Sequence, residues 1–165
     1  AYSRAYESYA DHSNLTEKGI NYTAMPVAGT IARGAEMPFH IEKDAPGDTT
    51  NYYASRAVKN PIDSLSKTDN DEAERLYLIN CGICHGKNLD GNGPLWKNGD
   101  GPYPSAPKNL VADPIVSVMP EGQMFYSVTY GKNLMGAYAS QLSRKQRWMV
   151  MKYVKNKQLA AKAAK

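Results

Sequence analysis

The sequence predicts a mostly α-helical domain that follows a long irregular N-terminal arm. Helical periodicity and helix-end signals begin near residue 69, whereas residues 1–68 are punctuated by Pro, Gly and Asn. The only two cysteines stand close together in the second part of the chain. A chain of 165 residues has room for one ordinary domain and an extension, so we expect the domain over residues 69–160.

The arm, residues 1–68, lacks the sustained periodicity of a helix or a strand. Pairs such as Met25-Pro26 and Asn60-Pro61 favour extended backbone before each proline. Its tyrosine content is too high for a typical disordered linker. We interpret it as an extended arm that becomes ordered by docking on partner subunits, with a flexible leader as the alternative.

Three helices are predicted after the arm. An acidic first turn and a shared apolar face predict a helix over 71–80. A short helix over 121–130 ends at Gly131. Ser143 and Gln146 have the form of a capping box, which predicts that the last helix begins at Ser143. Between these helices, residues 86–118 are rich in Gly and Pro and are predicted as loops, and residues 161–165 as a frayed tail.

The run Cys81-Gly82-Ile83-Cys84-His85 has the C-x-x-C-H pattern of a c-type haem attachment sequence. Its two thiols can add across the haem vinyl groups, and the imidazole can reach the iron as an axial ligand. The sequence therefore predicts one covalently attached haem c. A redox dithiol is the alternative, but it favours a motif that follows a strand, and a zinc finger lacks its second cysteine pair.

Met135 is the methionine that we favour as the second iron ligand. It lies in the loop before the last helix, where Gly131 and Gly136 would let the backbone approach a haem. Met119 and a five-coordinate iron are the alternatives. Two further histidines lie in the arm and are assigned to surface or hydrogen-bonding roles: His12 and His40.

Further loop residues are candidates for supporting roles. The carbonyl of Pro94 or Pro107 could hold the second ring nitrogen of His85. Three side chains could line a haem pocket, with ordinary loop packing as the alternative: Tyr103, Leu110 and Trp96.

Composition excludes several classes of function. The net charge of +4 is better explained by a lysine-rich helix end than by a nucleic-acid partner, because no recognised nucleic-acid motif is present. No apolar stretch is long enough to be a transmembrane segment. No acid/base constellation is visible, since Asp90 and Asp100 fit turns in a Gly-rich loop.

Several segments resemble known families. Those similar to class I c-type cytochrome domains are Cys81–His85, Gly101–Ala106, Tyr130–Met135 and Arg147-Trp148. A narrower resemblance, to the mono-haem cytochrome c subunit of bacterial alternative complex III, is carried by Met25–Gly34, Lys59-Asn60-Pro61 and Met135–Gln141. Alternative complex III is a quinol:cytochrome c or quinol:acceptor oxidoreductase.

This resemblance implies that Cys81 and Cys84 hold the haem and that His85 and Met135 ligate its iron. It implies a peripheral subunit on the periplasmic side of the bacterial inner membrane, beside a multi-haem cytochrome and other subunits. Such a subunit passes electrons to a periplasmic carrier or a terminal oxidase, and a lipid anchor would lie outside this chain. A free periplasmic electron shuttle and a peroxidase-like haem domain are the alternatives.

Overall fold

The structure, a computed structural model, describes residue 6 and residues 10–22, 29–30 and 39–163. The chain divides into two compact units, Ala1–Met37 and Pro38–Lys165. In the first unit, helix α1 (Ser13–Thr16) follows His12, whose ring lies 4.7 Å from that of Tyr22.

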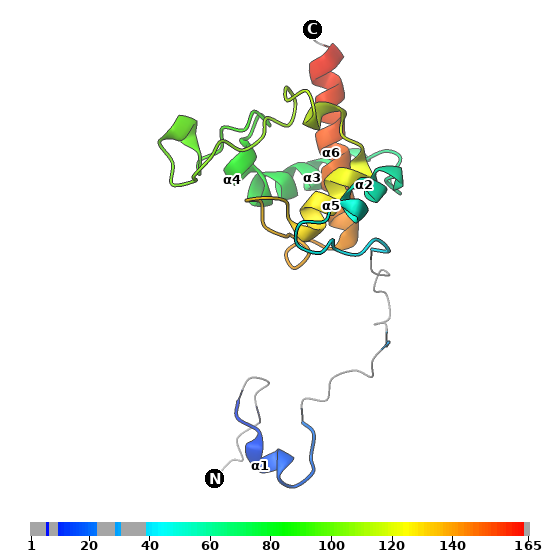
Figure 1. Ribbon diagram of the computed structural model, residues 1–165, viewed down its shortest axis with the longest axis vertical. Coiled ribbons are helices and arrows are strands. Elements are labelled where there is room, and N and C mark those ends of the chain that lie inside the picture. The colour runs from blue at the N-terminus through cyan, green and yellow to red at the C-terminus, as the bar shows by residue number, and fades with distance from the viewer. Residues whose placement is uncertain (1–5, 7–9, 23–28, 31–38, 164–165) are drawn as a thin grey trace. The chain divides into compact units, whose positions relative to one another are not determined.

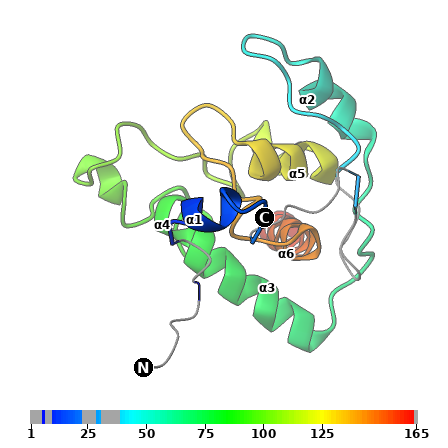
Figure 2. The same cartoon turned by 90° about the horizontal axis from the view of Figure 1, so that it is seen from below.

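The second unit is built from helices and loops. Helix α6 packs against both α3 and α5, and the loops after α4 extend away from α2 (Figures 1 and 2). The elements are α2 (Thr50–Ala54), η1 (Ser55–Ala57), α3 (Lys67–Asn80), α4 (Gly82–His85), η2 (Lys97–Gly99), η3 (Val116–Val118), α5 (Glu121–Tyr130) and α6 (Arg144–Ala163). The described residues contain no β-strand, which confirms the predicted fold class.

Aromatic side chains hold the three long helices together. Phe125 of α5 stacks on Trp148 of α6 with ring centroids 3.8 Å apart. Tyr77 of α3 lies 5.6 Å from Tyr153 of α6. Such pairs add about 0.5–1.5 kcal/mol beyond the burial of their area. The apolar residues on the inner faces of α3 and α6 are buried: Ala73, Leu76, Tyr77, Trp148, Val150, Met151 and Val154. On the same faces, Asn80, Cys81 and Lys155 are half-buried.

The ends of α5 and α6 confirm the predicted signals. Helix α5 ends before Gly131, which has a φ of 83°. The backbone N–H of Ser143 donates to Gln146 Oε1 at 2.9 Å, and the N–H of Gln146 donates to Ser143 Oγ at 3.2 Å. This reciprocal pair is the predicted capping box.

Two helices are longer than predicted. Helix α3 begins at Lys67 because Ser66 Oγ accepts the backbone N–H of Asp69 at 3.1 Å and caps it. Helix α6 continues to Ala163, so residues 161–163, predicted to fray, are helical. Residues 164–165 lie outside the described part.

Residues 39–66, predicted as part of the arm, pack on the helices. Phe39 contacts Phe125 with ring centroids 5.0 Å apart, and the Tyr126 hydroxyl donates to Asp44 Oδ2 at 2.9 Å. Gly122 of α5 lies so close to η1 that a Cβ there would be 2.2 Å from the carbonyl oxygen of Ser55. The compact helical unit therefore begins upstream of residue 69. Docking of the remaining arm on partner subunits stays a prediction.

Candidate haem-binding site

The C-x-x-C-H motif forms one helical turn at the end of α3. The backbone N–H groups of Cys84 and His85 donate to the carbonyl of Cys81 at 3.1 and 2.8 Å. Residues three and four apart on a helical turn share a face, so the motif presents two thiols and an imidazole together. All three side chains are half-buried.

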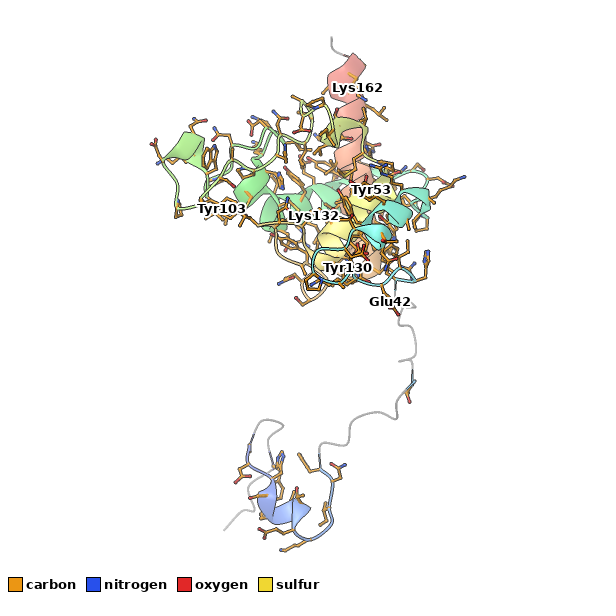
Figure 3. All side chains as sticks on the ribbon, viewed as in Figure 1. Glu42, Tyr53, Tyr103, Tyr130, Lys132 and Lys162 are labelled. Atoms are coloured by element: carbon orange, nitrogen blue, oxygen red, sulfur yellow. The ribbon has the colours of Figure 1, made fainter. Side chains whose placement is uncertain are left out.

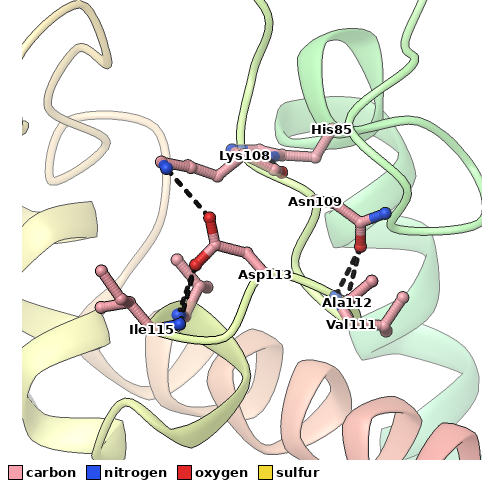
Figure 4. A network of polar contacts seen from close by, with 8 residues as sticks. His85, Lys108, Asn109, Val111, Ala112, Asp113 and Ile115 are labelled. Atoms are coloured by element: carbon pink, nitrogen blue, oxygen red, sulfur yellow. Dashed lines mark hydrogen bonds and ion pairs between the residues drawn. The ribbon is translucent and has the colours of Figure 1, made fainter.

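A backbone carbonyl fixes the ring of His85. Nδ1 lies 2.8 Å from the carbonyl oxygen of Lys108 (Figure 4). Because a carbonyl can only accept, Nδ1 carries the proton and Nε2 keeps its lone pair. Burial lowers the pKa of His85, which favours the neutral ring. A neutral imidazole with a free Nε2 is the form that binds a metal.

Pro94 and Pro107 were the predicted sources of this carbonyl, and both predictions were wrong. The carbonyl belongs to Lys108, the residue that follows Pro107. The carbonyl of Pro107 faces Gly91 instead, where a Cβ would lie 2.4 Å from its oxygen. Gly91 has a φ of 83°, and its N–H donates to the carbonyl of His85 at 2.9 Å. The Lys108 carbonyl, one residue further on, is the one that faces the imidazole.

Side chains of the same loop hold Lys108 in place (Figure 4). Asn109 Oδ1 accepts two backbone N–H groups of the following turn at 3.0 and 2.7 Å. Asp113 Oδ1 accepts two more at 2.9 and 3.0 Å, and its Oδ2 pairs with Lys108 Nζ at 2.9 Å. These bonds, first the backbone N–H of Val116 and then Lys108, lower the pKa of Asp113. The loop is thereby fixed on the side of His85.

The two thiols are neutral in this environment. Burial raises the pKa of Cys81 to about 12, and it also raises the pKa of Cys84. A redox dithiol needs a thiol with a lowered pKa, so this environment disfavours that alternative. Among the residues that the structure describes, no three His, Cys, Asp or Glu side chains form a metal-binding group.

Met135 lies in a tight turn between α5 and α6. The N–H of Lys132 donates to the Met135 carbonyl at 2.9 Å, and the N–H of Met135 donates back at 3.0 Å. Gly131 is needed here, since a Cβ would lie 2.7 Å from the Met135 carbonyl oxygen. A Cβ on Gly136 would meet nothing within 4 Å, so space is open beside Met135.

The Met135 turn and the cysteine turn are neighbours in the fold. The Tyr103 hydroxyl, from the Gly/Pro-rich loop, donates to the Leu134 carbonyl at 2.9 Å (Figure 3 labels Tyr103). Burial raises the pKa of Tyr138, and nearby Cys81 and Cys84 raise it further. Tyr138, three residues after Met135, is therefore near the two thiols. The thiols and imidazole of the cysteine turn are the donors that a c-type haem needs, and Met135 as a further ligand stays a prediction.

The other candidate residues pack in the core or stabilise turns. Met124 of α5 is buried in the core, and both Met119 and Leu110 pack partly buried against that core. Asp90 Oδ1 accepts the N–H of Asn92 at 2.9 Å, which is the predicted turn role. Two methionines of the arm lie outside the described residues: Met25 and Met37.

Sequence reasoning missed Lys108, Asp113 and Tyr138. Asp113 could have been found, because an Asp followed by Pro favours a turn in which its carboxylate accepts backbone N–H groups. Lys108 and Tyr138 carry no local signal, since their roles depend on contacts between distant segments.

Comparison with known proteins gives a family for the chain. No curated protein matches it. In the part of the chain that the structure describes, no helix is long and apolar enough to cross a membrane. The family model described as "Cytochrome C oxidase, cbb3-type, subunit III" matches residues 68–154, which span α3 to α6 and contain both the C-x-x-C-H motif and Met135. Since this match covers more than half of the chain, the protein belongs to that family and contains a cytochrome c domain of class I.

Proposed function

We propose that this chain is the mono-haem electron-transfer subunit of a membrane respiratory complex that oxidises quinol, of the alternative complex III type. Family membership supports haem-based electron transfer. The narrower assignment is supported by the resemblance of Met25–Gly34, Lys59-Asn60-Pro61 and Met135–Gln141 to that subunit. The family description names a subunit of an oxidase, which is also a membrane respiratory complex.

One observation carries the electron-transfer assignment. The 2.8 Å bond from His85 Nδ1 to the Lys108 carbonyl leaves Nε2 as the lone-pair nitrogen, on the same helical turn as Cys81 and Cys84. A surface histidine would not need this fixed tautomer. A metal-ligating histidine does, because the second-shell acceptor sets both ring orientation and ligand basicity.

The residues of this chain have separable roles in the proposal. Cys81 and Cys84 would attach one haem c covalently, and His85 and Met135 would be its axial ligands. Haem c supplies one-electron redox chemistry when it is bound. A thioether ligand raises the reduction potential relative to a second imidazole, and two protein ligands leave no open position for peroxide. This favours electron transfer over a peroxidase-like reaction.

Spectra of methionine variants test the ligand assignment. Met135→Ala should convert the ferric protein from a low-spin to a high-spin spectrum, and Met119→Ala should leave it low-spin. Met119 and Met135 both pack partly buried against the same core, so the pair controls for the loss of a partly buried methionine. A low-spin spectrum in Met135→Ala with a change in Met119→Ala would move the ligand to Met119.

Copurification tests the placement in a complex. We expect the chain on the periplasmic side of the inner membrane, with residues 1–37 docking on a multi-haem cytochrome or another subunit and electrons leaving to a carrier or terminal oxidase. Tagged full-length chain should elute with a large detergent-solubilised complex, and removal of residues 1–37 should release it. A monomer at every stage would support the free periplasmic shuttle instead.

A further inference from the structure

A pocket lies directly beside the Met135 turn, inside the second compact unit. Its volume is about 320 Å³, and its two walls are the segment Lys43–Tyr52 and the loop Gly131–Ala137, with Tyr126 and Tyr130 of α5 as its floor. The segment upstream of residue 69 therefore reaches the loop that carries the proposed ligand.

The two walls meet through a cation–π contact. Lys132 Nζ lies 4.1 Å from the centre of the Tyr52 ring. Both side chains are half-buried, which reduces the competition from water. Lys132 is labelled in Figure 3 beside the end of α5, next to the segment that leads into α2.

The Tyr52 wall is itself fixed on α5. The Tyr130 hydroxyl donates to the Ile41 carbonyl at 2.7 Å, and the Tyr126 hydroxyl donates to the Asp44 carboxylate at 2.9 Å. Asp44 also accepts the backbone N–H groups of Asn51 and Tyr52 at 2.7 and 2.8 Å. These bonds fix the backbone at Tyr52 independently of the contact with Lys132.

The loop that carries Lys132 also carries Met135, the proposed iron ligand. The paired backbone bonds of 2.9 and 3.0 Å between Lys132 and Met135 close a turn of four residues. A restraint on the Lys132 side chain therefore limits the excursions of Met135. On the other side of the turn, the Tyr103 hydroxyl holds the Leu134 carbonyl at 2.9 Å.

We propose that Tyr52 and Lys132 are positioning residues that keep Met135 on the iron. The proposal rests on the proposed function, in which Met135 is an axial ligand. Residues upstream of the matched family region would then control the sixth coordination position. Loss of the contact increases the fraction of molecules in which the turn opens and Met135 leaves the iron.

Imidazole competition measures that fraction. Added imidazole binds the ferric iron only where Met135 has left, so its apparent affinity rises in proportion to the open fraction. The probe is a titration of full-length ferric holoprotein, followed at the near-infrared methionine–iron charge-transfer band. Tyr52→Leu and Lys132→Gln should each lower the apparent Kd about fivefold, the equivalent of about 1 kcal/mol for a half-buried cation–π pair. The double variant should add nothing to either single one.

Two variants separate this role from general packing. Tyr52→Phe keeps the ring and should restore wild-type imidazole affinity, although it loses the hydroxyl contact with Ser127. Tyr53→Leu, on the same helix, removes a ring that contacts Arg56 and lies 5.4 Å from the Tyr52 ring, but it keeps the Tyr52 ring that Lys132 contacts. It should therefore change the affinity much less than Tyr52→Leu.

The outcomes separate the two proposals. Absence of the charge-transfer band in the wild-type protein would refute methionine ligation itself. A normal band with unchanged imidazole affinity in Tyr52→Leu would refute the positioning role alone. A change in Tyr53→Leu equal to that in Tyr52→Leu, or additive effects of Tyr52→Leu and Lys132→Gln, would also overturn it.

Discussion

Gly91 is the position at which a single methyl group should disturb the support of His85. Gly91 has a φ of 83°, and a Cβ there would lie 2.4 Å from the Pro107 carbonyl oxygen and 3.2 Å from the backbone of Lys108 and Asn109. These are backbone atoms, so no side chain can rotate away. We expect Gly91→Ala to displace the backbone of residues 107–109, which would weaken the bond between the Lys108 carbonyl and the imidazole.

The expected magnitude has two contributions. A left-handed backbone costs a non-glycine residue about 1 kcal/mol, and overpacking against backbone costs about 1–3 kcal/mol. Gly99→Ala is the matched control, because Gly99 has a φ of 98° in the same loop but its Cβ would meet only the Trp96 ring at 3.9 Å. We expect Gly91→Ala to lower the free energy of unfolding by about 2–4 kcal/mol, and Gly99→Ala by about 1 kcal/mol.

Guanidinium unfolding of the holoprotein measures this difference, and voltammetry reports on His85. Weakening the bond to the Lys108 carbonyl makes the imidazole a poorer electron donor, so the reduction potential should rise in Gly91→Ala and stay unchanged in Gly99→Ala. Equal losses of stability in the two variants, with equal potentials, would refute the packing of residues 107–109 behind His85.

Two further predictions concern the supports of the domain. Gly122→Ala should lower the free energy of unfolding by about 1–3 kcal/mol, because its Cβ would lie 2.2 Å from the Ser55 carbonyl oxygen. An unfolding midpoint equal to that of the wild type would contradict the packing of η1 on α5. Because its hydrogen bonds lower the pKa of Asp113 from 3.8, this carboxylate stabilises the fold above that pH and the stabilisation is lost as the pH falls through the lowered pKa. Asp113→Asn should therefore flatten the fall in stability below about pH 4 relative to wild type, as measured by guanidinium unfolding across that range; parallel curves would argue against the role.

The helical part of the fold could be predicted because its signals are local. Ser143 and Gln146 show a capping box within four residues, and Gly131 ends α5 as its position suggests. The start of α3 was placed too late because residues 67–70 are polar and show no apolar periodicity. Its signal was the Ser66 cap, which pairs with Asp69 three residues on.

The packing of residues 39–66 could not be predicted from local pattern. Tyr126 and Asp44 are 82 residues apart in sequence, and neither shows which partner it meets. The haem motif could be predicted because its chemistry lies within Cys81–His85, but the support for His85 comes from 23 residues away. Which carbonyl faces the imidazole depends on the backbone conformation of the Pro107–Asn109 segment, and proline content alone does not determine it.

The central claim is that the C-x-x-C-H turn holds one haem c covalently. The most direct measurement combines the intact mass of the denatured chain with a pyridine haemochrome spectrum. We predict a mass increase of a single haem, a spectrum of the c type, and loss of both when Cys81 and Cys84 are replaced by Ala. A denatured chain without added mass, purified from a host with active haem attachment, would contradict the account.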